Sequence, residues 1–149
     1  MALQAHIGAG WTIRPHSRAD REAIAYVHHA CLSDFPWLLT ARHDPDALEY
    51  ALRYTTAMVA EEPSAGVIGF IILNTENAFV SHLFVLPDWR LCGVGSGLLD
   101  VARVLTTKPL RQELDARNHQ GRSALSAMGW TEIMAPPGTP NWQVRLVAP

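Results

Sequence analysis

The chain has 149 residues, of which 48% are apolar and 17% are charged, with a net charge of −2 and a pI of about 6.4. This length predicts one domain over 1–149 with a sizeable core, and the weak negative charge argues against nucleic acid as a partner. Two cysteines are too few for a disulfide framework, and no apolar run reaches the length of about 18 residues that a membrane span needs. Residues 1–10 lack the pattern of a signal peptide, so we expect a cytoplasmic protein without a membrane partner.

The first half of the chain is predicted to contain three strands and two helices. The strands are expected over 11–14, 56–60 and 67–73, and the helices over about 20–34 and from 45 onward. Ser17 or Asp20 can cap the first helix, and Asp44 followed by Pro45 is typical of a helix start. Gly69 indicates a bulge or a close backbone contact within its strand, unless it is incidental.

The second half is predicted to alternate strands with helices and to end in a strand pair. Strands are expected over 79–85, 110–116, 130–134 and 142–147, and helices from Ser96 and from Asn118 to Gly129. The resulting order, β-α-α-β-β-β-α-β-α-β-β, predicts an α/β fold: a mixed α+β sheet with helices on both faces. If the apolar strand over 142–147 lies at a sheet edge, two copies could pair there as a homodimer.

A loop with two glycines, 90–95, joins the strand over 79–85 to the next helix. A strand, a turn and a helix in this order point unpaired backbone N–H groups at an anion. Gly93 and Gly95 have no Cβ, so a phosphate could approach the main chain closely. The loop has neither a Gly-Lys-Ser/Thr ending nor a third glycine, so it is neither of the two common phosphate loops. On the residues alone, a tight strand-to-helix turn without a ligand remains the alternative.

Two motifs resemble those of a known family, and with the elements around them they cover nearly the whole chain. The first motif consists of Leu83-Phe84-Val85, Pro87, Arg90-x-x-Gly93-x-Gly95 and Leu98-Leu99. The second consists of Asn118, Gly121, Ala124, Leu125, Gly129 and Trp130. In this order and at this spacing they resemble the GCN5-related N-acetyltransferases, the GNAT family. The resemblance implies the acyl-CoA N-acyltransferase fold, in which two central strands splay apart and admit the cofactor.

The resemblance also implies the reaction and its binding residues. It implies acetyl transfer from acetyl-CoA, as co-substrate, to a primary amine of a small molecule or peptide by direct attack. The implied cofactor contacts are Leu83, Phe84 and Val85 on the pantetheine arm, Arg90, Leu91, Cys92, Gly93, Val94, Gly95 and Ser96 on the pyrophosphate, and Asn118 on the same arm. Phe35 and Trp37, between the first two helices, are implied to wall the substrate pocket. His28, His29 and His43 lack the spacing of a metal site, so no metal is expected.

Two residues are candidates for the base that takes the proton of the amine. Glu113 comes first, because some family members place a catalytic glutamate five residues before the asparagine. His82 comes second, because an imidazole with a pKa near ~6.5 accepts a proton at neutral pH. Ser81 could orient a water. Glu113 can also be read as an ordinary strand carboxylate, and His82 as a histidine packed beside the sheet.

The chain departs from the family at the general acid. The family tyrosine that protonates the leaving thiolate sits seven residues after the asparagine, where this chain has Leu125. Three interpretations stay open: the thiolate leaves unaided, Tyr26 or Tyr54 reaches in, or the chain is a catalytically weak or inactive acetyl-CoA-binding module with a regulatory role. The change Leu125→Tyr tests whether an acid is missing. An unrelated α/β interaction domain remains only if the double match is accidental.

Overall fold

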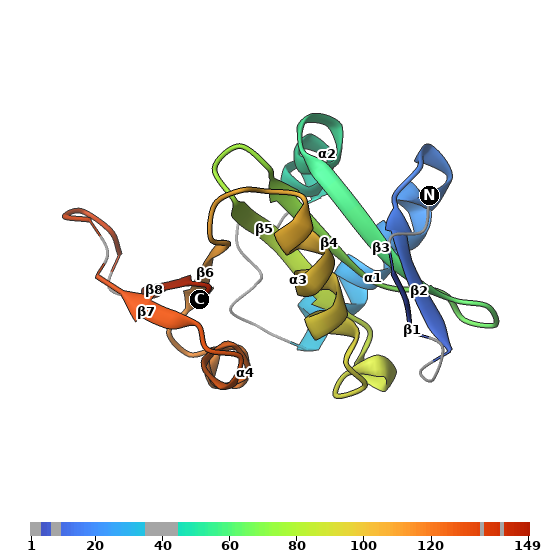
Figure 1. Ribbon diagram of the computed structural model, residues 1–149. Helices are drawn as coiled ribbons and strands as arrows, with labels where there is room; N and C mark the ends of the chain where they lie inside the picture. Colours follow the sequence, from blue (N-terminus) through green and yellow to red (C-terminus); the bar gives the residue numbers. More distant parts are fainter. Residues whose placement is uncertain (1–3, 7–9, 35–44, 135, 141) are drawn as a thin grey trace.

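The computed structural model describes residues 4–6, 10–34, 45–134, 136–140 and 142–149 (Figure 1). Within these ranges, eight strands form one sheet in the order β1-β2-β3-β4-β5-β6-β8-β7. The strands are β1 (Gln4–His6), β2 (Trp11–Pro15), β3 (Thr56–Glu62), β4 (Gly66–Asn74), β5 (Phe79–Val85), β6 (Arg111–Asp115), β7 (Thr131–Ile133) and β8 (Gln143–Val147). The helices are α1 (Arg21–Asp34), α2 (Pro45–Tyr54), α3 (Val94–Val104) and α4 (His119–Ala127), with 3-10 turns η1 (Arg18–Asp20) and η4 (Pro87–Trp89).

The strand pairing confirms the predicted mixed sheet and adds two features. β5 and β6 are parallel, and every other neighbouring pair is antiparallel. β1 was not predicted, because three residues are too few to carry a period; it pairs with β2. β8 lies between β6 and β7, so the strand over 142–147 is not at a sheet edge and the condition for pairing two copies there is not met. Its Leu146 lies opposite Gln112 of β6 and is 1% exposed, so packing holds β8 inside the sheet.

Helices cover both faces of the sheet, as predicted (Figure 1). On one face, which we call the α1 face, α1 and α2 pack through Ile24, Val27, Cys31, Leu48 and Leu52 on Phe70, Ile72 and Phe84. On the other, the α3 face, α3 and α4 pack through Val94, Leu98, Leu99 and Leu125 on Ile71, Val80 and Leu146. No helix among the described residues has the length and apolar character needed to cross a bilayer.

A partly buried ion pair fixes the start of α1. Asp20 accepts hydrogen bonds from the Ser17 backbone N–H at 2.7 Å and from both terminal nitrogens of Arg14 at 2.8 Å. These bonds, first of all those from Arg14, lower the pKa of Asp20 from 3.8 to about 2. The predicted cap at Ser17 and Asp20 is therefore present, and Arg14 ties it to β2.

Asp20→Asn is expected to lower the free energy of unfolding by about 2 kcal/mol near neutral pH, the size of the pKa shift. Because the pKa of Asp20 is lower in the folded state, the ionised carboxylate stabilises the fold at every pH above the pKa of the unfolded chain. This contribution is lost as the pH falls from about 4 towards 2. Urea titrations at several pH values in this range should show that the free energy of unfolding falls steeply with pH in the wild type and less steeply in the variant. Glu61→Gln, which removes a more exposed partner of Arg14 at 3.1 Å, should cost less than about 1 kcal/mol. Equal pH slopes for the wild type and Asp20→Asn would contradict this assignment.

Candidate functional site

The parallel strands β5 and β6 are paired only at their first residues. Phe79 lies opposite Arg111 and Val80 opposite Gln112, and the pairing ends there. β5 continues to Val85 and β6 to Asp115, and the two ribbons move apart beyond the paired residues (Figure 1). This is the splay of two central strands that the family resemblance implies.

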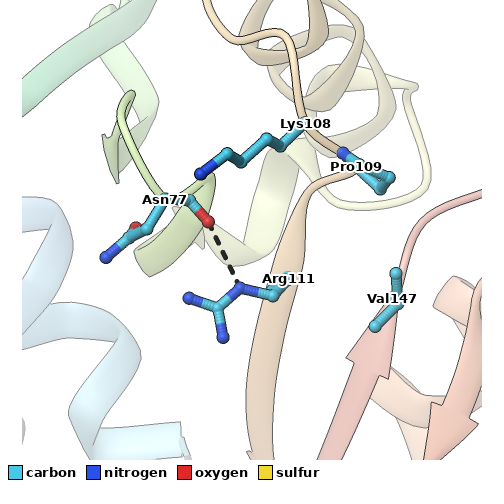
Figure 2. Close-up of a pocket in the computed structure, with 5 residues that line it drawn as sticks. All are labelled: Asn77, Lys108, Pro109, Arg111 and Val147. Carbon is cyan, nitrogen blue, oxygen red and sulfur yellow. Dashed lines mark hydrogen bonds between the residues drawn. The ribbon is translucent and has the colours of Figure 1, made fainter.

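Arg111 stabilises the end at which β5 and β6 are still paired. Its backbone N–H donates to Ala78 O at 2.9 Å, its Nε donates to Asn77 O at 3.2 Å, and its guanidinium lies 5.7 Å from the centre of the Phe79 ring. Figure 2 shows the pocket at this end, lined by Asn77, Lys108, Pro109, Arg111 and Val147. The pocket lies where β6 begins, so it is separate from the open end of the splay near Val85.

The glycine loop ends earlier than predicted. α3 begins at Val94 rather than Ser96, because the Gly97 N–H donates to Gly93 O at 2.9 Å and closes the first helical turn. Gly93 has a φ of +83°, a left-handed conformation that glycine adopts without strain. The N–H groups of Val94, Gly95 and Ser96 precede the first helical bond, so they lack partners within the helix and form its positive end.

Gly69 allows the start of α3 to pack directly on the sheet. A Cβ at this position would lie 3.0 Å from Phe84 O and 3.3 Å from Val94 Cγ1. The pairing of β3 with β4 also shifts beside it, leaving Ile68 as an extra residue. Both readings of Gly69 from the sequence, the bulge and the close contact, are therefore confirmed. Because glycine has no side chain, the loop and the start of α3 can lie directly against the end of β5.

His82 lies on the α1 face because Ser81 forms a bulge in β5. Ile72 pairs with His82 and Leu73 with Val80, which leaves Ser81 as the extra residue and shifts the alternation of side chains. Val80 therefore packs on the α3 face, whereas His82 is 4% exposed on the other face, in a cluster of rings with His28, Phe70 and Phe84. The ring centroids of His82 and His28 are 5.7 Å apart.

Glu113 faces the same side of the sheet as His82. Leu114 packs into the α3 face, so its neighbour Glu113 points to the α1 face, as alternation along the strand predicts. There Glu113 lies opposite Arg145 of β8 and forms an ion pair with it at 3.3 Å. The two candidate bases thus lie on one face, on the two strands that diverge.

The second motif forms the start of α4 and part of the core. Asn118 Oδ1 accepts a hydrogen bond from the Gly121 N–H at 2.9 Å, which confirms the predicted cap. A Cβ at Gly121 would lie 2.8 Å from Asn118 Nδ2, so glycine leaves room for this cap. Leu125 is 4% exposed within the core of the α3 face. Ser123 and Ser126 are exposed.

The other candidate residues contribute little to the geometry of the site. Tyr26 and Tyr54 are 68% and 64% exposed, on the solvent sides of α1 and α2. Phe35, Trp37 and His43 lie outside the described residues. Within the part of the chain that the structure describes, no three His, Cys, Asp or Glu side chains are grouped as a metal site.

The sequence did not predict the contacts that Arg90 makes. Its Nε donates to Val85 O at 2.9 Å, one terminal nitrogen pairs with Asp34 at 3.2 Å, and the other donates to Cys31 Sγ at 3.4 Å. Burial is the main cause that raises the pKa of the Cys31 thiol. Asp34 and Cys31 lie more than fifty residues from Arg90, so no local pattern could have predicted these contacts.

The search of protein-family models gave no match to this sequence, and neither did the search of curated proteins. Solved structures do match over nearly the whole chain. A GNAT-family acetyltransferase from Staphylococcus aureus and an acetyltransferase from Streptococcus agalactiae each have a TM-score of 0.74 at 15% identity, over 93% of this chain and 98% of theirs. Apo YjaB from Escherichia coli has a TM-score of 0.67 at 21% identity, over 92% of this chain and 96% of its own. The chain therefore has the fold of the GNAT-family acetyltransferases.

Proposed function

We propose that this protein is a GNAT-family N-acetyltransferase that moves an acetyl group from acetyl-CoA to a primary amine by direct attack. The observation that carries the proposal is the divergence of β5 from β6 beside the glycine-capped start of α3. A strand edge without a neighbouring strand can accept an extended amide chain such as pantetheine, and a helix start attracts an anion such as pyrophosphate. Solved acetyltransferases share this fold.

Main-chain groups hold the coenzyme in this proposal. The N–H groups of 91–96 contact the pyrophosphate, since the Arg90 N–H already donates to Pro87 O, and Leu83 to Val85 bind the pantetheine amides along the edge that β6 leaves. The Asn118 side-chain amide contacts the same arm through Nδ2, because its Oδ1 caps α4. Local N–H groups supply the attraction for the anionic coenzyme, since the chain as a whole is slightly negative.

His82 accepts the proton of the attacking amine. Ser81 Oγ lies 2.8 Å from His82 Nδ1 and 3.4 Å from Ile72 O. In this proposal the single hydroxyl proton goes to Ile72 O, and Ser81 Oγ accepts from His82 Nδ1–H. This tautomer makes Nε2 the acceptor nitrogen. Glu113 is the second candidate, because its carboxylate is already engaged by Arg145 at 3.3 Å. Ser81 then orients the imidazole rather than a water.

The chemical step needs no protein acid in this proposal. The amine nitrogen attacks the thioester carbonyl carbon, a C–N bond forms, and a backbone N–H of β5 stabilises the resulting oxyanion. The C–S bond then breaks and the pair of electrons leaves with sulfur as coenzyme A thiolate. A thiol pKa of ~8.5 makes the thiolate an adequate leaving group near neutral pH. Neither Leu125 nor the solvent-facing Tyr26 and Tyr54 supplies a proton.

A thiol-release assay with a panel of amines tests the function. The panel contains small amines, amino acids, aminoglycosides and peptides with free N-termini, each with acetyl-CoA. We expect release of coenzyme A that requires both the protein and an amine. Binding of acetyl-CoA without turnover on any amine would instead favour the second candidate, a cofactor-binding regulatory module.

The residue that favours this second candidate is Leu125, and a matched pair of variants tests its role. Leu125→Tyr and Leu125→Phe add similar rings to the same buried position, at a similar packing cost of about 1–3 kcal/mol. Only tyrosine adds an acid. If the thiolate leaves unaided in the wild type, we expect kcat of Leu125→Tyr to exceed that of Leu125→Phe by about tenfold or more. Equal kcat values for Leu125→Tyr and Leu125→Phe would show that an added acid at this position does not help the reaction.

A further inference from the structure

The Arg90 side chain connects two faces of the sheet. The backbone around Arg90 leads into α3, which packs on the α3 face. Its guanidinium instead reaches the end of α1 on the opposite face, where it contacts Asp34 and Cys31. Arg90 therefore passes around the end of β5 and joins the glycine loop to α1.

The contacts form one connected group, which we call the Arg90 latch: Arg90, Asp34, Cys31 and the Val85 carbonyl. Cys31 Sγ is fully buried and donates to Val85 O at 3.4 Å, the same oxygen that accepts from Arg90 Nε. The carboxylate of Asp34, at the last residue of α1, is 42% exposed and the Arg90 side chain 28%. A half-buried charged hydrogen bond and a buried thiol thus hold the end of β5, the loop and α1 together.

This geometry separates the side chain of Arg90 from the anion site formed by the loop that follows it. The N–H groups that have no partner within the helix belong to the first turn of α3, on the other face of the sheet. To reach an anion there, the guanidinium would give up its bonds to Val85 O, Asp34 and Cys31. A side chain with three such bonds is better placed to hold the loop than to bind the ligand.

We infer that Arg90 is a positioning residue whose latch couples coenzyme binding at the loop to the last turn of α1. The inference rests on the proposed function, since it takes acetyl-CoA as the ligand of the loop. The segment 35–44, which the family resemblance implies as a wall of the acceptor pocket, follows directly after Asp34. Coupling of this kind is reciprocal, so order at the end of α1 also strengthens coenzyme binding.

Hydrogen exchange with coenzyme A as the probe tests the latch. In the wild type, saturating coenzyme A should slow exchange of the amides at 30–34 by about threefold or more, because the fixed loop holds the helix end closed. In Asp34→Asn the ligand should still raise the melting temperature, yet the slowing at 30–34 should fall below about half of the wild-type value. Asp34→Glu, which keeps the carboxylate, should retain most of the slowing.

A control variant and a second measurement distinguish the latch from a general loss of stability. Glu49→Gln removes another exposed ion pair of α1, with Arg21 at 2.7 Å, and should leave the slowing at 30–34 unchanged. In the absence of ligand, alkylation of Cys31, with the exposed Cys92 as internal reference, should be faster in Asp34→Asn than in the wild type. Equal slowing at 30–34 in Asp34→Asn and the wild type, or none in a wild type that binds coenzyme A, overturns the latch alone. A wild type that does not bind coenzyme A overturns the latch and the proposed function together.

Discussion

His82→Gln is expected to lower kcat for acetyl transfer by about a hundredfold or more, with KM for acetyl-CoA changed by less than about threefold. Glutamine keeps a polar side chain at a buried position but cannot take the proton of the amine. The loss falls on kcat because the proton moves in the chemical step, whereas the coenzyme is held by main-chain groups. Steady-state kinetics with the best amine of the panel provide the measurement.

Two further variants show whether the effect belongs to His82. Glu113→Gln breaks the ion pair with Arg145 and should lower kcat by less than about fivefold, because Glu113 does not accept the proton. Ser81→Ala removes the hydroxyl that orients the imidazole and should give an intermediate loss of about tenfold. A large loss of kcat in Glu113→Gln together with a near-normal kcat in His82→Gln would contradict this assignment and identify Glu113 of β6 as the base.

Gly93→Val is expected to weaken coenzyme binding by about tenfold or more and to lower the free energy of unfolding by about 1–2 kcal/mol. The φ of +83° at Gly93 is strained for a residue with a Cβ, and valine is branched there. Apart from its chain neighbours, no atom of the described residues lies within 4 Å of an added Cβ, so the cost in stability is expected to come from the backbone. The loss of affinity comes from a displaced loop and a side chain in the path of the phosphate. Calorimetric titration with coenzyme A measures it.

Gly66→Val is the matched control. Gly66 has a φ of +78° and open space around an added Cβ, but it is the first residue of β4, next to the turn from β3. Its substitution should lower the stability by a similar amount while the dissociation constant for coenzyme A changes by less than about twofold. If both variants weaken binding equally, the effect reflects stability and Gly93 has no special role in the site.

Elements whose side chains follow a local pattern could be predicted from the sequence. The helix at Pro45 was predicted because its proline and the apolar spacing of Leu48 and Leu52 both indicate a helix with one buried face. β5 was predicted because aromatic and branched residues fill it and a proline follows. The start of α3 was placed two residues late, because Gly95 reads as loop by composition. The bond from Gly97 to Gly93 includes it in the helix.

Features that depend on distant pairing could not be predicted in the same way. The position of β8 between β6 and β7 follows from the register of Leu146 against Gln112, which no local pattern encodes. The bulge at Ser81 decides that His82 faces α1, whereas plain alternation would put His82 on the side of Val80. The contact of Arg90 with Asp34 joins residues of two separate elements. In each case the geometry comes from the packed sheet rather than from the nearby sequence.

Thermal unfolding with and without acetyl-CoA, using free adenosine as the control, tests the central claim most directly. At a hundred times its dissociation constant, acetyl-CoA should add about 2.7 kcal/mol to the stability, which raises the melting temperature by roughly 5–11 °C for a domain of this size. Adenosine, which lacks the pyrophosphate and the pantetheine arm, should leave the melting temperature unchanged. We expect a shift with acetyl-CoA that Gly93→Val reduces. An unchanged melting temperature at millimolar acetyl-CoA would contradict the account, because the loop and the splayed strands would then not be a coenzyme site.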